Sequence, residues 1–283
     1  MYQATSIIEL HQYVQHWKDH HQSISFVPTM GNLHDGHMSL IEKGQSLCDR
    51  SICSIFVNPM QFGPNEDFNH YPRTLDSDIR QLEAIGCDLV YMPTASELYP
   101  DGLDKISQIQ VTGLCEAFEG THRPGHFTGV ATIVLKLFNI VKPDVSVFGK
   151  KDYQQYRVIS KMVEDLNLEV QIIGAETQRE DSGLATSSRN QYLSDAEREK
   201  SVLIFQLLQQ AGQQISEGKR DFIRIEADAL ARLREAGFEP DYFSICNAHT
   251  LKPANDQDRD LVILVTAALG KTRLLDNLEI SLW

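Results

Sequence analysis

Short apolar segments alternate with stretches of helix length along the first 176 residues of the chain. The apolar segments are rich in β-branched residues and occupy residues 23–27, 51–57, 88–92, 144–149 and 169–175. The stretches between them carry apolar residues at helical spacing. Strands that are buried on both faces and alternate with helices are typical of a parallel sheet covered on both sides. The pattern predicts a doubly wound parallel-sheet (Rossmann-like) α/β domain in residues 1–176.

The two ends of the chain follow other patterns. Residues 1–22 place Ile7, Leu10, Val14 and Trp17 on one stripe, which predicts an amphipathic helix. After about residue 176 a polar stretch leads into two helical runs, and three strand-like segments follow. The helical runs cover about 195–217 and 221–236, and the strand-like segments cover 242–248, 261–270 and 272–281. This order predicts a smaller α+β lid domain with antiparallel strands in residues 177–283.

Composition limits the class of partner and the compartment. The net charge of −13 opposes general binding to nucleic acid, because neutralising phosphates requires a surplus of Lys and Arg. No apolar run approaches the roughly 18 residues that span a bilayer, and the N-terminus lacks the pattern of a signal peptide. The five cysteines are dispersed and form no CxxC pair. We therefore expect reduced thiols and a cytoplasmic protein that binds neither membrane nor nucleic acid.

A histidine pair, His34 and His37, follows the first predicted strand within the stretch VPTMGNLHDGH. Ligands of open parallel sheets bind beyond the carboxyl ends of the strands. A helix is expected to begin near His37, and the free amides and dipole of a helix start attract anions. Gly31 and Gly36 would allow a sharp turn and a close approach of phosphate oxygens. The imidazoles could then stabilise charge on a departing pyrophosphate.

Two other interpretations of the histidine pair stay open at this point. Two histidines three residues apart have a spacing that suits a metal site, but no nearby cluster supplies obvious third and fourth ligands. Histidines on the surface without a chemical role are the other alternative.

Three further polar motifs follow predicted strands or begin the second domain. In VNPMQFG, the amides of Asn58 and Gln61 could fix hydroxyls and a carboxylate, although the motif also suits a plain turn. In FGKKDYQQ, Lys151 could neutralise a phosphate, while Asp152 could hold ribose hydroxyls or only cap a helix. The serine-serine-arginine run of ATSSRN could close over triphosphate oxygens or form a helix-capping loop.

The order TMGNLHDGH, SIFVNPMQFGPNED, HRPGHFTGV, FGKKDYQQ and SSRNQYLS resembles the pantothenate synthetase (pantoate–β-alanine ligase) family, of the His-x-Gly-His nucleotidyltransferase-like superfamily. The likeness runs from about residue 23 to 195. It implies an ATP-dependent ligase of the coenzyme A precursor pathway that joins (R)-pantoate to β-alanine. It further implies a pantoyl adenylate, release of pyrophosphate and AMP, Mg²⁺, and a homodimer.

The same resemblance assigns roles to individual residues. His34, His37 and Lys151 would be catalytic. The ATP-binding residues would be Met30, Gly31, Asn32, Leu33, His34, Asp35, Gly36, His37, Gly149, Lys150, Lys151, Asp152, Gln178, Thr186, Ser187, Ser188 and Arg189. The substrate-binding residues would be Asn58, Gln61, Arg123, His126 and Gln155, with Gln61 contacting both pantoate and incoming β-alanine. Asp78, with Gln81 nearby, would lie at the magnesium ion, although a solvated helix face also accounts for both.

Four positions depart from the family pattern. Lys150 stands where Glu is usual, Ser182 where Asp is usual, and Thr186 and Gln178 where apolar residues are usual. They alter contacts around the nucleotide without removing a predicted catalytic group. Two rival functions follow from the same motifs: a nucleotidylyltransferase that keeps the nucleotide in its product, and a nucleotide-binding regulatory protein without turnover.

Overall fold

The computed structural model describes residues 1–64, 66 and 68–282, and the chain divides into two compact units. Unit 1 comprises Met1–Lys150 and Gln154–Glu176, and unit 2 comprises Lys151–Tyr153 and Thr177–Trp283. Within the described residues, none of the helices combines the length and the apolar content that crossing a bilayer requires.

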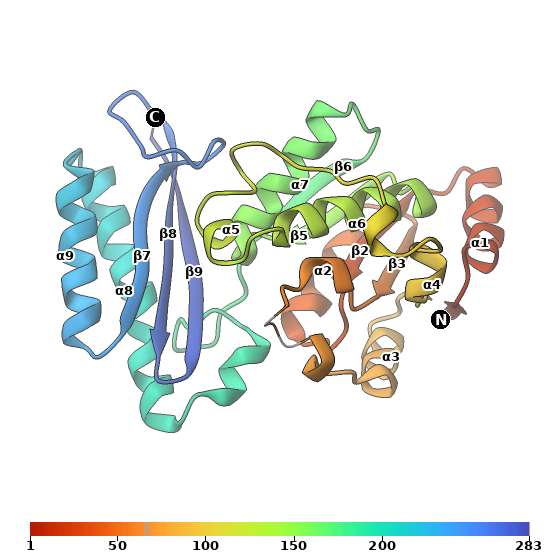
Figure 1. The fold of residues 1–283 in the computed structure, drawn as a ribbon, viewed down its shortest axis with the longest axis horizontal. Helices are drawn as coiled ribbons and strands as arrows, with labels where there is room; N and C mark the ends of the chain where they lie inside the picture. Colours follow the sequence, from red (N-terminus) through yellow and green to blue (C-terminus); the bar gives the residue numbers. More distant parts are fainter. Residues whose placement is uncertain (65, 67, 283) are drawn as a thin grey trace. The chain divides into compact units, whose positions relative to one another are not determined.

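Unit 1 is built on a sheet of six parallel strands (Figure 1). In spatial order these are β1 (Tyr2–Ala4), β4 (Leu89–Tyr91), β3 (Arg50–Ile55), β2 (Ile24–Thr29), β5 (Val145–Gly149) and β6 (Gln171–Ala175). The helices are α1 (Ile7–Asp19), α2 (Asp35–Gln45), α3 (Leu75–Ala84), α4 (Ala95–Leu98), α5 (Glu119–His122), α6 (His126–Val141) and α7 (Tyr153–Asp165). Short 3₁₀ turns are η1 (Pro59–Gln61), η2 (Phe68–His70) and η3 (Leu103–Lys105). A fourth, η4 (Lys150–Asp152), begins at the last residue of unit 1 before Lys151 and continues in unit 2.

Side chains alternate between the two faces of this sheet, and helices cover both. Val27 and Val147 pack with α2 and α3 in one buried cluster. Their neighbours Phe26 and Phe148 point to the other face, where each contacts Phe138 of α6 with ring centroids 6.4 Å apart. Burial on both faces is what near-continuous apolar strands require. The predicted doubly wound α/β fold is confirmed.

The N-terminal segment differs from its prediction in one respect. Residues 2–4 form the edge strand β1, which pairs in parallel with β4, and the helix begins only at Ile7. A capping box fixes this start, because Ser6 and Glu9 each satisfy a backbone amide of the other. The apolar stripe of α1 is buried as expected through Leu10, Val14 and Trp17.

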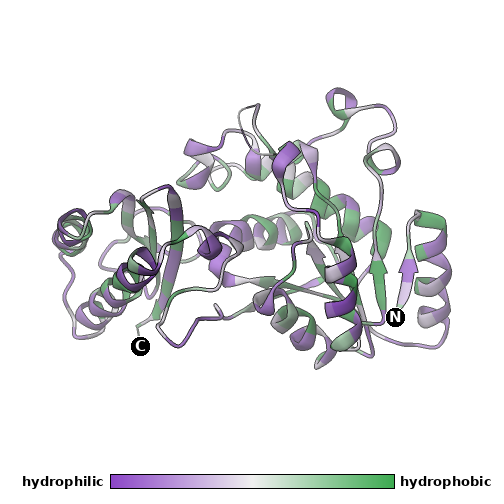
Figure 2. Ribbon diagram, turned by 90° about the horizontal axis from the view of Figure 1, so that it is seen from below, coloured by the Kyte–Doolittle hydropathy of each residue, from purple (hydrophilic) through white to green (hydrophobic). Residues whose placement is uncertain are grey.

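Unit 2 contains an antiparallel sheet of three strands in the order β7 (Glu239–Asn247), β8 (Asp260–Leu269) and β9 (Thr272–Ser281). Two long helices, α8 (Asp195–Ser216) and α9 (Phe222–Glu235), cover one side of it (Figure 1). These helices show both hydrophilic and hydrophobic residues along their length (Figure 2). Their apolar residues, among them Leu208 and Leu233, join Ile263 and Val265 of β8 in the core of the unit. The predicted α+β character of this region is confirmed.

Candidate functional site

Strand order in unit 1 reverses between β2 and β5. From β2 the chain proceeds through β3 to β4 on one side, and from β5 it proceeds to β6 on the other. The carboxyl ends of β2 and β5 therefore flank the topological switch point, where ligands of doubly wound sheets bind. The loop after β2 carries the histidine motif, and the turn after β5 begins at Gly149 and Lys150. Two motifs that are far apart in the sequence thus emerge beside each other.

The loop after β2 has an unusual backbone that a buried carboxylate holds in place. Gly31 and Asn32 have φ angles of 81° and 52°, and a side chain at Gly31 would come within 3.0 Å of Asp78 Oδ2. Asp78 Oδ2 accepts from the Asn32 amide and Oδ1 from the Leu33 amide, both at 2.9 Å. Thr74 Oγ1 donates to the same carboxylate at 3.0 Å. Asp78, almost fully buried on α3, thereby fixes the loop; its predicted role at magnesium stays a prediction.

Helix α2 begins at Asp35, two residues before the start expected from the sequence. The reason is that His34 takes the N-cap position and its Nδ1 accepts from the Gly36 amide at 3.2 Å. The glycine is needed there, because an added Cβ would lie 2.9 Å from the His34 ring. With Nδ1 used as an acceptor, His34 carries its proton on Nε2 and presents a donor. The His34 and His37 rings lie together, with centroids 4.2 Å apart.

The predicted amide pair after β3 also comes together. Asn58 caps η1 and is buried, and its Nδ2 donates to Gln61 Oε1 at 3.1 Å. Gln61 Nε2 points toward Met30 Sδ at 3.1 Å, so the pair lies next to the loop after β2. Gly129 of α6 permits this arrangement, because a Cβ there would be only 2.5 Å from Met60 O. The turn interpretation of VNPMQFG describes the backbone, but the side chains form a buried polar network.

Arg123 and His126 lie beside the η1 turn of unit 1. His126 Nδ1 donates to Gln61 O at 2.8 Å, which fixes the backbone of η1. Arg123 donates to His126 Nε2 at 3.1 Å and forms a two-bond ion pair with Glu66 at 2.9 and 2.5 Å. The Arg123 guanidinium holds the pKa of the Glu66 carboxyl below its ordinary value. The contacts of Arg123 and His126 are thus structural, and their predicted role in substrate binding stays a prediction.

Beyond β5, Lys150 Nζ lies 2.8 Å from the exposed Glu176 carboxylate. A lysine at this position therefore has an acidic partner at the end of the neighbouring strand β6. Gln155 of α7 is half-buried, whereas the preceding Gln154 is buried and holds the segment before α6. Gln154 donates to the carbonyls of Leu114 and Ala117 at 2.7 Å.

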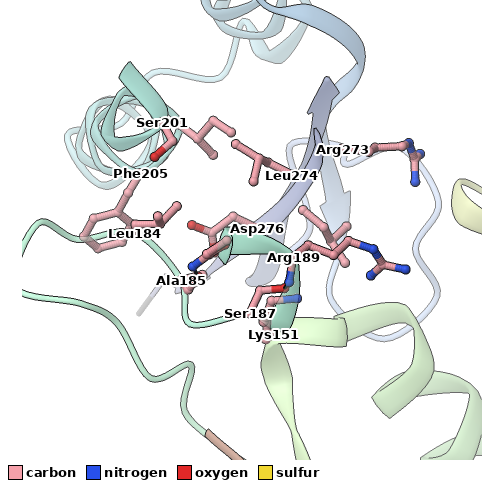
Figure 3. Close-up of a pocket in the computed structure, with 13 residues that line it drawn as sticks. Lys151, Leu184, Ala185, Ser187, Arg189, Ser201, Phe205, Arg273, Leu274 and Asp276 are labelled. Carbon is pink, nitrogen blue, oxygen red and sulfur yellow. Dashed lines mark hydrogen bonds between the residues drawn. The ribbon is translucent and has the colours of Figure 1, made fainter. Parts of the chain in front are cut away.

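In unit 2, other predicted nucleotide-binding residues line one pocket. Lys151, Ser187 and Arg189 contribute to its wall, and Lys151 and Ser187 lie next to each other (Figure 3). Ser187 caps the 3₁₀ turn η5 (Ser188–Tyr192) and accepts from the Arg189 amide at 3.3 Å. Arg273 of β9 adds a third basic side chain. Lys151, Arg189 and the Ser187 hydroxyl are donors suited to phosphate oxygens, whereas Arg273 is paired with Asp241 at 2.7 Å and Asp276 adds a carboxylate to the wall.

The loop that carries these serines is held by buried polar contacts in the same unit. Thr186 N donates to Gln178 O at 2.9 Å, so these two predicted residues face each other across a short bridge. Arg179 forms a two-bond ion pair with Asp276 at 2.6 and 2.9 Å, and its guanidinium lies 3.7 Å from the centre of the Phe205 ring. Ser188 is half-buried, and Asp152 lies 3.6 Å from Lys151 Nζ.

Known proteins resemble this chain over nearly its whole length. The profile of the family described as pantoate-beta-alanine ligase matches residues 3–279. The chain belongs to this family. The ligase family includes a pantothenate synthetase of Idiomarina loihiensis, 50% identical over 268 residues that cover 95% of each chain. A pantothenate synthetase of Pseudomonas putida is 53% identical over 259 residues, covering 92% of this chain and 90% of the relative.

Solved structures of the ligase family have the same fold. Pantothenate synthetase from Thermus thermophilus has a TM-score of 0.91 and 38% identity, over 99% of this chain and 100% of that one. The pantoate-beta-alanine ligase of Francisella tularensis, whose structure is described as a complex with "Beta-gamma ATP and Beta-alanine", has a TM-score of 0.80 and 35% identity, over 98% and 97%. The family predicted from the motifs is confirmed, and the chain is an enzyme of the pantoate–β-alanine ligase type.

The motifs did not reveal every residue that shapes the site. Tyr99, Glu66 and Arg179 were not predicted, although each contacts a predicted residue or the segment that carries one. Tyr99 lies 41 residues after its partner Asn58, and no local pattern connects the two. The sequence singled out Asp78 as a residue at the magnesium ion, whereas the structure shows its carboxylate accepting hydrogen bonds from the Asn32 and Leu33 amides.

Proposed function

We propose that the enzyme condenses (R)-pantoate with β-alanine at the expense of ATP, with pantoyl adenylate as the intermediate and with pantothenate, AMP and pyrophosphate as products. The main support is the loop after β2, where Asp78 fixes two consecutive backbone units and His34 caps α2 at the topological switch point. Helix N-termini at this edge of the sheet are anion sites, and ATP is the anion that the ligation requires.

In the first step a carboxylate oxygen of pantoate attacks the α-phosphorus of ATP. The new O–P bond forms while the bond to the bridging oxygen breaks, and pyrophosphate leaves. His34 donates through Nε2, and His37 lies next to it at the same helix start. Donors placed where negative charge develops lower the barrier most effectively, which is the role proposed for both imidazoles. Gln61 and Asn58 position pantoate, and Arg123, His126 and Gln155 complete its binding residues.

Unit 2 supplies the second set of nucleotide-binding residues. Lys151, Ser187, Ser188 and Arg189 bind phosphate oxygens, supported by the donors that Lys151, Ser187 and Arg189 contribute to one pocket. Gly149, Lys150, Asp152, Gln178 and Thr186 complete the proposed ATP-binding residues. Magnesium, when bound, would neutralise charge on the phosphates, and Asp78 is its proposed protein residue. Within residues 1–64, 66 and 68–282, no three His, Cys, Asp or Glu side chains form a cluster suited to a metal.

In the second step the amine of β-alanine attacks the acyl carbon of the adenylate. The C–N bond forms, the C–O bond to AMP breaks, and the ammonium proton passes to solvent. Holding the two reactants in the reactive geometry lowers the activation barrier by on the order of 7 kcal/mol, the low end of the general estimate for intramolecular reactions. Residues 177–283 act as the lid that keeps water from the mixed anhydride. We further propose a cytoplasmic homodimer.

The test is a two-stage assay on the full chain. With ATP, Mg²⁺ and pantoate, the enzyme should release pyrophosphate in an amount close to that of enzyme sites, and AMP should appear only when β-alanine is added. If AMP instead stayed attached to the acceptor substrate as the final product after β-alanine was added, the enzyme would be a nucleotidylyltransferase. Binding of ATP and pantoate without any release would indicate a regulatory protein.

Replacement of His37 by Ala should slow pyrophosphate release by roughly a hundredfold or more, because a charge-stabilising donor is lost. The matched control is His16→Ala on α1, where His16 forms a similar ring pair with His20, with centroids 4.4 Å apart, on an exposed helix. The control should retain full activity. Equal rates in the two variants would reject the proposed role of His37.

A further inference from the structure

Three buried polar side chains form a continuous chain of hydrogen bonds in unit 1. Tyr99, at the end of α4, donates through its hydroxyl to Asn58 Oδ1 at 2.6 Å. Asn58 in turn donates to Gln61 Oε1 at 3.1 Å. The exposed fractions of Tyr99, Asn58 and Gln61 are only 5%, 1% and 8%. A buried network of this kind restricts each member to one orientation, because an unpaired polar atom there is costly.

Two backbone groups decide which way the Asn58 amide points. The Met60 amide can only donate, and it lies 3.3 Å from Asn58 Oδ1. The Gly129 carbonyl can only accept, and it lies 3.3 Å from Asn58 Nδ2. Turning the amide over would place donor against donor and acceptor against acceptor. Oδ1 is therefore the end that faces Tyr99, and Nδ2 is the end that faces Gln61.

The orientation of Asn58 then fixes the orientation of Gln61. Gln61 Oε1 is used to accept from Asn58 Nδ2, so the amide nitrogen Nε2 is presented on the other side. There it points toward Met30 Sδ, and a thioether is a weak acceptor. Gln61 thus offers N–H donors beside the histidine loop that an oxygen of a ligand would satisfy better than sulfur does. The Gln61 side-chain oxygen is turned toward Asn58 instead.

Tyr99 is suited to hold the outer end of this chain. Burial raises the pKa of Tyr99, so its hydroxyl keeps its proton and donates throughout the physiological pH range. The bond to Asn58 is shorter than the bond that Asn58 accepts from Met60. Without the hydroxyl, Asn58 Oδ1 would retain only the longer contact from Met60, and the amide would be held less firmly.

We propose that Tyr99 is a positioning residue: its hydrogen bond steadies the orientation of Asn58 that Met60 and Gly129 set, and Asn58 in turn holds Gln61 with its Nε2 donors toward a carboxylate or hydroxyl oxygen of pantoate. This inference rests on the proposed function, because it takes Gln61 as a pantoate-binding residue. Tyr99 itself does not contact the substrate in this scheme, and its hydroxyl acts only by orienting the two amides.

The experiment compares two variants that each remove one buried tyrosine hydroxyl. Tyr99→Phe should raise the KM for pantoate about fivefold to tenfold, as expected when one buried hydrogen bond is lost, while the KM for ATP stays unchanged. Tyr91→Phe is the matched control, since Tyr91 is fully buried in the same unit and donates to Glu97 at 3.3 Å, outside the Tyr99–Asn58–Gln61 network. The control should alter the thermal midpoint but not the KM for pantoate.

A double-mutant cycle tests whether Tyr99 acts through the orientation of Asn58 or by loosening the surrounding structure. In an Asn58→Ala background the hydroxyl has no amide to orient, so adding Tyr99→Phe should cause no further rise in the KM for pantoate. An unchanged KM in Tyr99→Phe, an equal rise in Tyr91→Phe, or effects that multiply in the double variant would each overturn the proposal. If the unaltered enzyme released no pyrophosphate with pantoate, the proposed function would fail before this comparison began.

Discussion

Replacing Asp78 by Asn should loosen the loop that carries the histidine motif. In the structure the two carboxylate oxygens of Asp78 accept from the Asn32 and Leu33 amides and from the Thr74 hydroxyl. An asparagine can keep one oxygen in place, but its NH₂ group would then face a backbone N–H. At least one charge-assisted hydrogen bond is lost, and the other two weaken because the acceptor is no longer ionised.

The magnitude follows from those contacts. A hydrogen bond to a charged group contributes about 1.5–3 kcal/mol, and a buried donor left without a partner costs about 1–3 kcal/mol. We expect the free energy of unfolding of unit 1 to fall by roughly 3 kcal/mol. We also expect slower pyrophosphate release, because Gly31 and Asn32 hold left-handed φ angles that need the carboxylate to stabilise them.

The assay is urea denaturation combined with the pyrophosphate assay over a series of Mg²⁺ concentrations up to saturation. The control is Asp76→Asn, which removes an exposed carboxylate from the same first turn of α3 and should cost less than about 1 kcal/mol. If the Asp78 and Asp76 variants unfolded at the same urea concentration and reacted at the same rate, the reasoning would be refuted. A raised Mg²⁺ requirement with unchanged stability would instead support the predicted metal role of Asp78.

Two further predictions concern packing and pH. Gly129→Ala should lower the free energy of unfolding by about 1–3 kcal/mol and raise the KM for pantoate, because the new Cβ would lie 2.5 Å from Met60 O and 2.8 Å from Gln61 Cα; thermal melting and initial rates measure both. Glu226→Gln should stabilise the chain at neutral pH, since burial raises the pKa of Glu226 above its ordinary value of 4.5 while its Oε1 accepts from the Ile245 amide, a bond that glutamine can keep. A raised carboxyl pKa means that stability is lost as the pH rises through it, so urea midpoints of the two forms should differ at pH 7 and converge as the pH falls below 4.5; parallel midpoints at every pH would contradict this.

Most of the fold could be predicted from the sequence because its longer elements have local signals. Strands that are buried on both faces must be apolar throughout, as in β2 and β5, and the helices between them must carry a stripe. The histidine motif was recognisable for a similar reason, since its residues are contiguous. The short strand β1 was missed because three residues give no periodicity, and only pairing with β4 makes them a strand.

The sequence by itself determined the family and the two fold classes, and it predicted the contiguous residues that we propose contact the nucleotide. The tertiary structure decided how those residues are held. Asp78 reaches the loop after β2 from 46 positions away, and Tyr99 reaches Asn58 from 41 positions away. Such pairs leave no local pattern, because a hydrogen bond depends on distance and direction in space. The fold brings these segments together, so that the Asp78 carboxylate accepts hydrogen bonds from the loop after β2 and the Tyr99 hydroxyl donates to the Asn58 amide.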